Sequence, residues 1–222
     1  MCGRYTITQK ANKIVQQFKL DPEDEEFHPL YNASPGMKLP VISSDNPKKL
    51  RFFKWGLTAS PSIPPLINAR ADSLLDKKTF SSLVASKRCA VIADSFYEWK
   101  KVGKSKAPYR FVLNDESLFS FAGLWNTYTD KEGQEVFEFT IITTTPNRLM
   151  EGIHNRMPAI LLPEQEKLWL NTGLEFSHLS QILAPLPEAH LKRYAVSARV
   201  NNASNNSPDL LLPVAEQGEL FT

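Results

Sequence analysis

The chemistry available to this sequence begins at Cys2. Small second residues permit removal of the initiator methionine, so we expect a mature chain whose first residue carries an α-amine and a thiol together. With ordinary pKa values of roughly 8 and about 8.5, both groups keep a nucleophilic fraction near neutral pH. Such a pair can condense with an aldehyde through nitrogen and then close through sulfur to a thiazolidine ring. Cys2 therefore indicates covalent chemistry on a carbonyl group, although a cysteine near a chain end is also often frayed or simply buried.

Glu98 and His154 are the residues best suited to move protons for such a reaction. Glu98 lies between Tyr97 and Trp99, so in a strand its carboxylate would be partly desolvated, which suits proton transfer to and from an amine. His154 lies in an expected loop between a run of threonines and an apolar run, where an imidazole can exchange protons near physiological pH. Two alternatives stay open: strand alternation can turn Glu98 outward, and a single histidine can be incidental.

Asn68, Arg70 and Arg156 have the types expected of an anion site. Asn68 and Arg70 flank Ala69, so in an extended segment their side chains would share one face. That face would suit joint recognition of a sugar and its phosphate, and Arg156, two residues after the histidine, is also available for an anion. A turn asparagine and a surface arginine would have the same spacing. The cluster at residues 32–36 is typical of a turn, and we interpret it as structural.

Positive charge is concentrated in the middle of the chain. Residues 38–110 hold fifteen Lys and Arg and five Asp and Glu, a net charge of +10, whereas the rest of the chain has a net charge of −8. Within this middle part, residues 48–55 and 99–106 mix cations with aromatic side chains. Cations attract phosphates and aromatic rings stack on bases, so this composition favours a polyanion. The alternative is that the lysines solvate strand surfaces while the aromatics lie in the core.

The hydrophobic pattern predicts a mostly antiparallel α+β fold. Apolar residues at helical spacing predict helices over residues 8–19, 74–84 and 163–171. Lys87 and Arg88 lie near the C-terminal end of the second of these, where cations suit the helix dipole. The acidic residues 21–26 are expected to form a solvated loop. Strand-like runs separated by turn residues cover residues 89–93, 96–100, 109–113, 118–124, 137–145 and 192–197.

The composition sets further limits on the class of protein. At 222 residues, with 42% hydrophobic and 23% charged residues, the sequence predicts one domain spanning residues 1–222. It has no apolar run of the roughly 20 residues that a membrane span needs and no secretory signal, so a cytoplasmic protein is expected. Its two cysteines and four histidines form neither a disulfide framework nor a zinc pattern, so we expect no metal and no cofactor.

Taken together and in order, the clusters resemble the SRAP-domain family of abasic-site processing proteins over nearly the whole chain. The motifs that carry the resemblance are Met1-Cys2-Gly3-Arg4, Tyr31-Asn32-Ala33-Ser34-Pro35-Gly36, Trp55-Gly56-Leu57, Ile67-Asn68-Ala69-Arg70, Phe96-Tyr97-Glu98-Trp99, Ile153-His154-Asn155-Arg156-Met157-Pro158, and Val196-Ser197 followed by Val200-Asn201-Asn202. The resemblance implies the SRAP fold, which is α+β with a barrel-like, mostly antiparallel β core and flanking helices.

The resemblance also implies a function and a role for each site residue. Proteins of this family bind single-stranded DNA and single-strand to double-strand junctions, and their mature N-terminal cysteine, here Cys2, crosslinks to the ring-opened aldehyde of an abasic site and shields the lesion. Asn68 would position the cysteine and sugar, Glu98 would manage the protons of the α-amine, and His154 would assist opening of the sugar ring. The residues expected to bind DNA are Arg4, Arg70 and Arg156, through phosphates, and Trp55, by stacking. A monomer is expected.

Two positions differ from the usual pattern of the family. Asp72-Ser73 stands where Glu-Thr is usual, and Asn155 replaces a common aspartate. The first leaves open which group supports Arg70. The second leaves open how firmly His154 holds a proton, because an adjacent carboxylate would favour imidazolium and asparagine would not.

Three other functions remain open from the sequence. A cysteine peptidase of the same family would remove the residues before its own cysteine or cleave other proteins. An N-terminal-nucleophile glutamine amidotransferase, whose members also often begin Met-Cys-Gly, would use the amine as base for the thiol, although the later clusters do not match that class. A noncatalytic DNA-binding module would need the basic middle of the chain but not Cys2.

Overall fold

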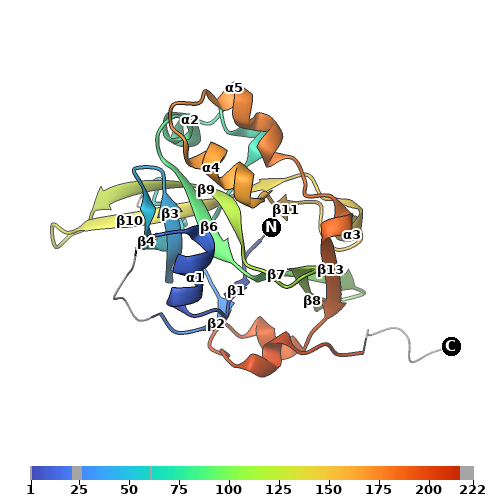
Figure 1. Cartoon of the computed structure of the whole chain (residues 1–222). Helices are drawn as coiled ribbons and strands as arrows, with labels where there is room; N and C mark the ends of the chain where they lie inside the picture. The colour runs from blue at the N-terminus through green and yellow to red at the C-terminus, as the bar shows by residue number, and fades with distance from the viewer. Residues whose placement is uncertain (1, 22–26, 61, 216–222) are drawn as a thin grey trace.

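Figure 1 shows a computed structural model of the chain, and the structure describes residues 2–21, 27–60 and 62–215. The expected acidic loop therefore lies, apart from Asp21, outside the described residues. The strands are β1 (Tyr5–Ile7), β2 (Leu30–Ala33), β3 (Lys38–Ser43), β4 (Asn46–Trp55), β5 (Asn68–Arg70), β6 (Arg88–Ala93), β7 (Ser95–Val102), β8 (Ser105–Leu113), β9 (Phe119–Thr129), β10 (Glu135–Thr144), β11 (Met157–Pro158), β12 (Ile160–Leu161) and β13 (Leu191–Ala195). The helices are α1 (Ala11–Phe18), α2 (Lys78–Val84), α3 (Arg148–Glu151), α4 (Pro163–Leu170) and α5 (Phe176–Leu179), with 3₁₀ turns η1 (Ala71–Ser73), η2 (Ser180–Leu183), η3 (Glu188–His190), η4 (Ala198–Asn201) and η5 (Pro208–Leu211).

Two sheets form the framework of the fold. The first has the strand order β13-β8-β7-β1-β2, and the second has the order β11-β10-β4-β3-β6-β9-β12, with β5 paired to β10. Because β9 also pairs with β10, the strands β10, β4, β3, β6 and β9 close into a barrel. Most pairs are antiparallel, while β4 and β5 run parallel to β10. These observations confirm the predicted α+β fold with a barrel-like, mostly antiparallel core and flanking helices.

The strand β6 illustrates how the core is built. All six of its residues are buried, because the strand belongs to the barrel wall and α4 packs against it from outside. The buried indole of Trp169 on α4 donates its Nε1 hydrogen to the carbonyl of Cys89 at 3.0 Å. A strand covered on both sides has an almost uninterrupted run of apolar residues, and this run is the pattern from which β6 was predicted.

The predicted helices correspond to α1, α2 and α4 with narrower bounds. Residues 163–171 contain α4, which has Pro163 in its first turn and is capped where Gln165 Oε1 accepts the backbone N–H of Leu162 at 2.9 Å. The helix α2 begins at Lys78 rather than at residue 74, because η1 and a turn occupy the start of that segment. Among the described residues, none of the helices combines the length and apolar character needed to span a bilayer.

Arg88 joins the C-terminal ends of two helices that cover the barrel. Its side chain is fully buried and donates to the carbonyls of Val84 at 2.8 Å and Trp169 at 2.6 Å, and also to those of Asn171 and Leu174. The last carbonyls of a helix lack partners inside the helix and carry partial negative charge, so a guanidinium satisfies both needs. The expectation that a cation at this position suits the second helix is confirmed and extends to α4.

Replacement of Arg88 is expected to destabilise the fold. Arg88→Met should lower the free energy of unfolding by about 3 kcal/mol, because several carbonyls closed off from water lose a charged donor. Urea unfolding followed by tryptophan fluorescence measures this, with Arg148→Met, an exposed arginine on α3, as the matched control. Equal unfolding midpoints for the two variants would contradict the bridging role of Arg88.

Candidate active site

The segment that contains Cys2 is held along β7. Tyr5 pairs with Phe96 in an antiparallel register, and the backbone N–H of Tyr97 donates to the carbonyl of Arg4 at 3.0 Å. From Arg4 the chain runs back to Cys2, which lies near enough to Glu98 to be affected by its charge. The Cys2 side chain is fully buried; burial, and then the nearby Glu98 carboxylate, raise the pKa of the thiol. The structure thus places Cys2 next to the predicted proton-transfer carboxylate, with its thiol in the neutral form.

Glu98 and His154 line one pocket of about 350 Å³. The complete lining is Glu98, Trp99, Lys106, His154 and Asn201. Glu98 is only 2% exposed, so the alternative in which strand alternation turns it outward is wrong. The indole Nε1 of Trp99 donates to Asn201 Oδ1 at 2.7 Å and fixes one wall of the pocket. Residues that are distant in sequence therefore bring a carboxylate, an imidazole and a lysine to the surface beside Cys2.

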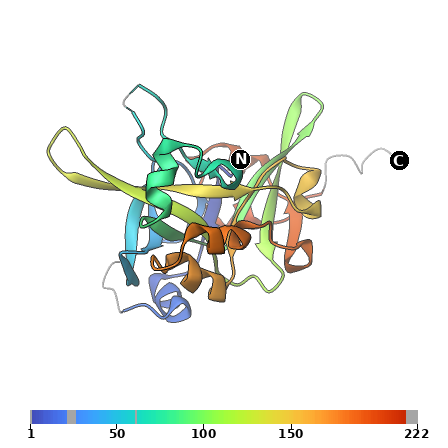
Figure 2. The same cartoon turned by 90° about the horizontal axis from the view of Figure 1, so that it is seen from above.

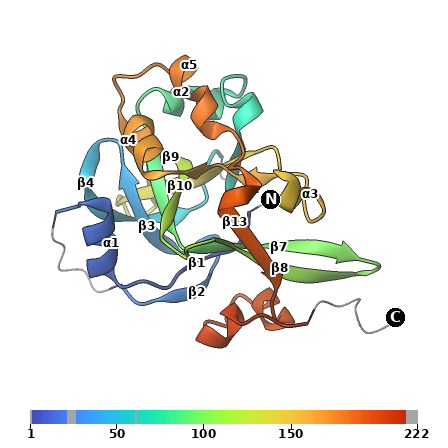
Figure 3. The same cartoon turned by 45° about the vertical axis from the view of Figure 1, so that its right-hand side comes forward.

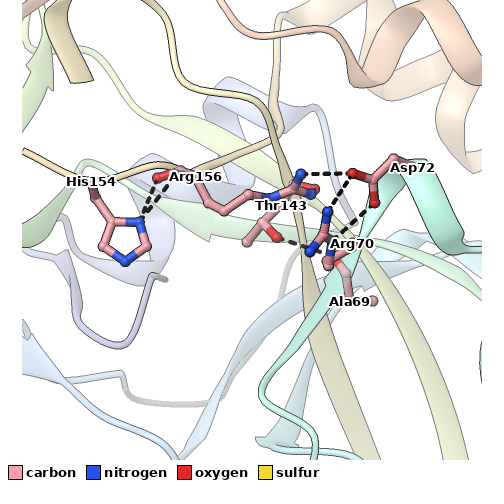
Figure 4. Close-up of polar contacts among 6 residues, drawn as sticks. All are labelled: Ala69, Arg70, Asp72, Thr143, His154 and Arg156. Carbon is pink, nitrogen blue, oxygen red and sulfur yellow. Dashed lines mark hydrogen bonds and ion pairs between the residues drawn. The ribbon is translucent and has the colours of Figure 1, made fainter. Parts of the chain in front are cut away.

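The orientation of His154 is set by the backbone around it (Figure 4). Its backbone N–H donates to the carbonyl of Met150 at the end of α3, and its ring Nδ1 lies 3.1 Å from the backbone nitrogen of Arg156. When Nδ1 accepts that N–H, the neutral ring carries its proton on Nε2. Figure 4 shows the Nε2 edge turned away from this contact, so the backbone of Arg156 orients the ring through Nδ1.

Asp72 connects two of the three predicted phosphate-binding arginines (Figure 4). Its carboxylate accepts two hydrogen bonds from Arg70, at 3.0 and 2.8 Å, and one from Arg156 at 3.0 Å. The Arg156 side chain is nearly buried and also donates to the carbonyl of Thr143, whereas the Arg70 side chain is 58% exposed. Asp72 therefore supplies the support for Arg70 that the departure from the family pattern left open.

Asn68 and Arg70 lie on one face of β5, as predicted. The strand β5 pairs in parallel with β10, and Ala69 between them is buried against the core. The Nδ2 group of Asn68 donates to the carbonyl of Ile67 at 2.9 Å. Its buried Oδ1 has no hydrogen-bond partner among the described residues. Buried acceptors are usually satisfied, so this oxygen is suited to an incoming donor.

Arg4 holds the N-terminal segment in place. Its guanidinium donates to Asn32 Oδ1 at 2.8 Å and to the carbonyls of Val200 at 2.9 Å and Asn201 at 3.4 Å. Asn32 is itself buried, and its Nδ2 donates to three carbonyls between residues 200 and 205. The structural interpretation of the cluster at residues 32–36 is confirmed. Contact of Arg4 with phosphate stays a prediction.

The expectation that Trp55 stacks on DNA bases is wrong. Its side chain is 1% exposed, its Nε1 donates to the carbonyl of Ile67 at 3.0 Å, and its ring lies against Phe139 and Tyr5. The side chain turns into the barrel, where it links β1 to the segment that leads into β5. The aromatic residue at the pocket is instead Trp99, which was expected only to flank Glu98.

Two further residues of the site were missed. Asp72 and Asn201 reach it through contacts between distant segments, and no local pattern distinguishes them from surface residues. Lys106 belongs to the basic residues 99–106, which were predicted to favour a polyanion but not to line this pocket. The occurrence of Asn201 in a quoted motif, and of Asp72 at a position that departs from the family pattern, were the signals available. Among the described residues, no group of three or more His, Cys, Asp and Glu side chains is placed to hold a metal ion.

The fold and the site define a β-barrel protein with a cysteine in its N-terminal segment, buried near a carboxylate that lines a pocket together with an imidazole. Residues 1–203 match the family model described as SOS response associated peptidase (SRAP), and the chain belongs to this family, as its resemblance predicted.

Several known proteins are similar to the chain over nearly its full length. It is 42% identical to the abasic site processing protein YoqW of Bacillus subtilis, over 95% of this chain and 99% of that protein. It is 30% identical to the abasic site processing protein YedK of Escherichia coli, over 96% of this chain and 100% of that protein. A crystal structure of a protein from Bacteroides thetaiotaomicron superposes with a TM-score of 0.87 at 27% identity, covering 96% of this chain and 100% of that one.

The Asp72 carboxyl is expected to titrate far below its ordinary range. The hydrogen bond from Arg70 is the largest cause that lowers its pKa, from 3.8 to about 2. A lowered pKa means that the folded chain binds this proton more weakly than the unfolded chain, so the associated stability is present above pH 3.8 and is lost as the pH falls through about 2.

Carbon-13 NMR titration of the Asp72 carboxyl measures this shift. Arg70→Gln should raise the midpoint toward 3.8, and Arg156→Gln should raise it less, because the Arg70 hydrogen bond is the larger cause. A wild-type midpoint at 3.8, or a larger change in the Arg156 variant, would show that the arginines are not held as the structure has them.

Proposed function

We propose that the protein processes abasic sites in single-stranded DNA by forming a covalent thiazolidine between mature Cys2 and the aldehyde of the lesion. The observation that carries the proposal is that Cys2 lies beside the buried Glu98, whose side chain lines a pocket together with His154. Membership of the SRAP family supports it, as do the relatives named abasic site processing proteins. The protein would act as a single-domain, cytoplasmic monomer without a metal or cofactor, on single strands and on single-strand to double-strand junctions.

The proposed reaction balances without any oxidant or reductant. Removal of Met1 frees the α-amine of Cys2, which attacks the aldehyde carbon of the ring-opened sugar, and loss of water gives an imine. The sulfur then adds to the imine carbon, and the thiol proton ends on the ring nitrogen. One water leaves, and the new C–N and C–S bonds shield the aldehyde from strand cleavage.

Glu98 and His154 would divide the proton transfers between them. Glu98 would take a proton from the ammonium of Cys2 so that nitrogen can attack, and return it to the hydroxyl that leaves as water. His154, with Nδ1 fixed by the backbone of Arg156, would exchange a proton with the sugar oxygen as the ring opens. Both side chains line one pocket, so a single bound sugar can meet both.

Asn68 and the arginines would hold the DNA around the lesion. The Oδ1 of Asn68 would accept a hydrogen bond from the amine or from a sugar hydroxyl. Arg70 is exposed and paired with Asp72 through two of its nitrogens, which orients its guanidinium for a phosphate. Arg156, which is nearly buried, would attract the DNA backbone by its positive charge. Arg4, which is hydrogen-bonded to Asn32, would do the same.

The crosslink is expected to depend on one of the two cysteines. Wild-type protein should form a denaturation-resistant conjugate with a single-stranded oligonucleotide that contains an abasic site, and none with intact DNA. Cys2→Ala should abolish the conjugate, whereas Cys89→Ala, which removes the other buried cysteine, should keep it. Denaturing gels and intact mass measure both, and a conjugate in Cys2→Ala, or active protein that retains Met1, would overturn the mechanism.

The same preparations separate the other functions. Hydrolysis of glutamine without any conjugate would favour the amidotransferase. Cleavage of other proteins that is lost in Cys2→Ala, again without a conjugate, would favour the peptidase. Binding of single strands that is equal for wild type and Cys2→Ala, with no reaction of any kind, would leave the noncatalytic DNA-binding module.

Loss of a proton-transfer group is expected to slow the crosslink without weakening DNA binding. Glu98→Gln and His154→Gln should each reduce the rate constant of conjugate formation by about 100-fold, the usual contribution of general acid–base catalysis. Glu188→Gln, on exposed η3, is the matched control. Rate constants come from timed quenching and affinities for intact DNA from fluorescence anisotropy, and rates equal to that of the control would remove both residues from the mechanism.

A further inference from the structure

The basic middle of the sequence contributes cations to several surfaces in the structure. On β3 and β4, two of the cations have partners within the protein. Arg51 pairs with Asp45 at 2.9 Å and lies 4.3 Å above the centroid of the Phe137 ring, and Lys54 lies 3.7 Å from the carboxylate of Glu138. Arg51, Lys54 and the Phe137 ring therefore make contacts within the protein that compete with binding of a nucleic acid.

The hairpin formed by β7 and β8 has unmatched charge. Its lysines are Lys100, Lys101, Lys104 and Lys106. Across the described parts of the chain, no carboxylate lies within the 4.0 Å of an ion pair from any of these four. Lys101 stands directly opposite Lys106 in the ladder, and both are exposed. Like charges directly opposite each other destabilise a hairpin, so this pair has a cost that an anion would remove.

The position of the hairpin connects this charge to the candidate active site. Figures 2 and 3 show the two strands extending beyond the body of the molecule. Glu98 on β7 and Lys106, the second residue of β8, line the pocket. At the tip, the positive φ of Gly103 permits the tight turn before Lys104. Five residues of strand from Glu98 to Gly103 span about 17 Å. That length matches about five steps of a DNA backbone at the 3.4 Å rise of the B-form.

We propose that the β7–β8 hairpin is a phosphate-binding arm for the DNA that flanks the lesion. The proposal rests on the proposed function, because it takes the pocket lined by Glu98 and Lys106 as the place of the abasic sugar. Lys106, which lines the pocket, contacts the backbone next to the lesion, and Lys100, Lys101 and Lys104, which do not line it, contact other phosphates of the same single strand. The pocket thus supplies the reaction, and the arm supplies affinity that does not depend on damage.

The length of the DNA separates the arm from the pocket. The test variant is the triple substitution Lys100→Gln, Lys101→Gln and Lys104→Gln, which leaves Lys106 in the pocket unchanged. The matched control, Lys10→Gln, Lys13→Gln and Lys131→Gln, removes the same charge from exposed positions on other surfaces. Each protein is titrated with long undamaged single strands at several salt concentrations. Each is also reacted with a short abasic oligonucleotide that cannot reach the tip.

The hairpin variant should bind long strands roughly tenfold more weakly than the control, and its slope of log affinity against log salt should be smaller by about 2. Its crosslinking of the short oligonucleotide should equal that of wild type. Equal affinity and slope in the two triple variants would overturn the arm while leaving the proposed function intact. Slower crosslinking of the short oligonucleotide by the hairpin variant would also overturn it, since the lysines would then act at the pocket. Failure of wild type to crosslink the short abasic oligonucleotide would instead count against the proposed function, and the binding titrations would still decide the arm.

Discussion

The placement of β1 is the constraint on which the candidate site depends. A nucleophile that uses its α-amine must lie at a chain end, and chain ends ordinarily fray. Here all three residues of β1 are buried and the strand lies between β2 and β7 within a sheet. Arg4, immediately before it, is tied through Asn32 to the η4 region near the other end of the described chain. Cys2 therefore has a defined position beside Glu98 although only a short segment holds it.

A buried polar network fixes the register of that strand. Asp94 is nearly buried and accepts hydrogen bonds from the side chains of Thr6 and Thr8, while Arg110 on β8 donates to Ser95 at 2.8 Å. A slip of β1 by one residue would turn Cys2 to the opposite face of the sheet. It would also leave Asp94 without these donors, at a cost of about 1–3 kcal/mol for each buried polar group left unsatisfied. The network thus stabilises one alignment of β1 and, through it, one position of the thiol.

Most helices and strands of this fold were predictable from the sequence, but the closure of the strands into a barrel was not. Helix and strand periodicity is local, so α4 and β6 follow from their own residues. The parallel pairing of β4 with β10, which closes the barrel, joins Trp55 to Phe139 and has no local signal. The same closure explains Trp55: neighbouring cations suggested exposure, but the barrel turns the indole inward. The residue types and the family resemblance selected Cys2, Glu98 and His154, and only tertiary contacts add Asp72, Lys106 and Asn201.

The raised pKa of the Cys2 thiol is compatible with the proposed reaction, in which nitrogen attacks first. Peptidases and amidotransferases of the cysteine class begin with a thiolate, which a site provides by lowering the pKa of the thiol. At Cys2, burial and the neighbouring Glu98 raise that pKa instead. A carboxylate beside a neutral thiol is poorly placed to create a second negative charge, but it is well suited to relieve an ammonium of its proton. In thiazolidine formation the sulfur enters only after the imine exists, when the carbon is electrophilic enough for a thiol that transfers its proton to nitrogen as it adds. The buried Cys2 and its neighbour Glu98 are therefore poorly suited to a thiolate mechanism and better suited to the proposed reaction, which begins at the amine.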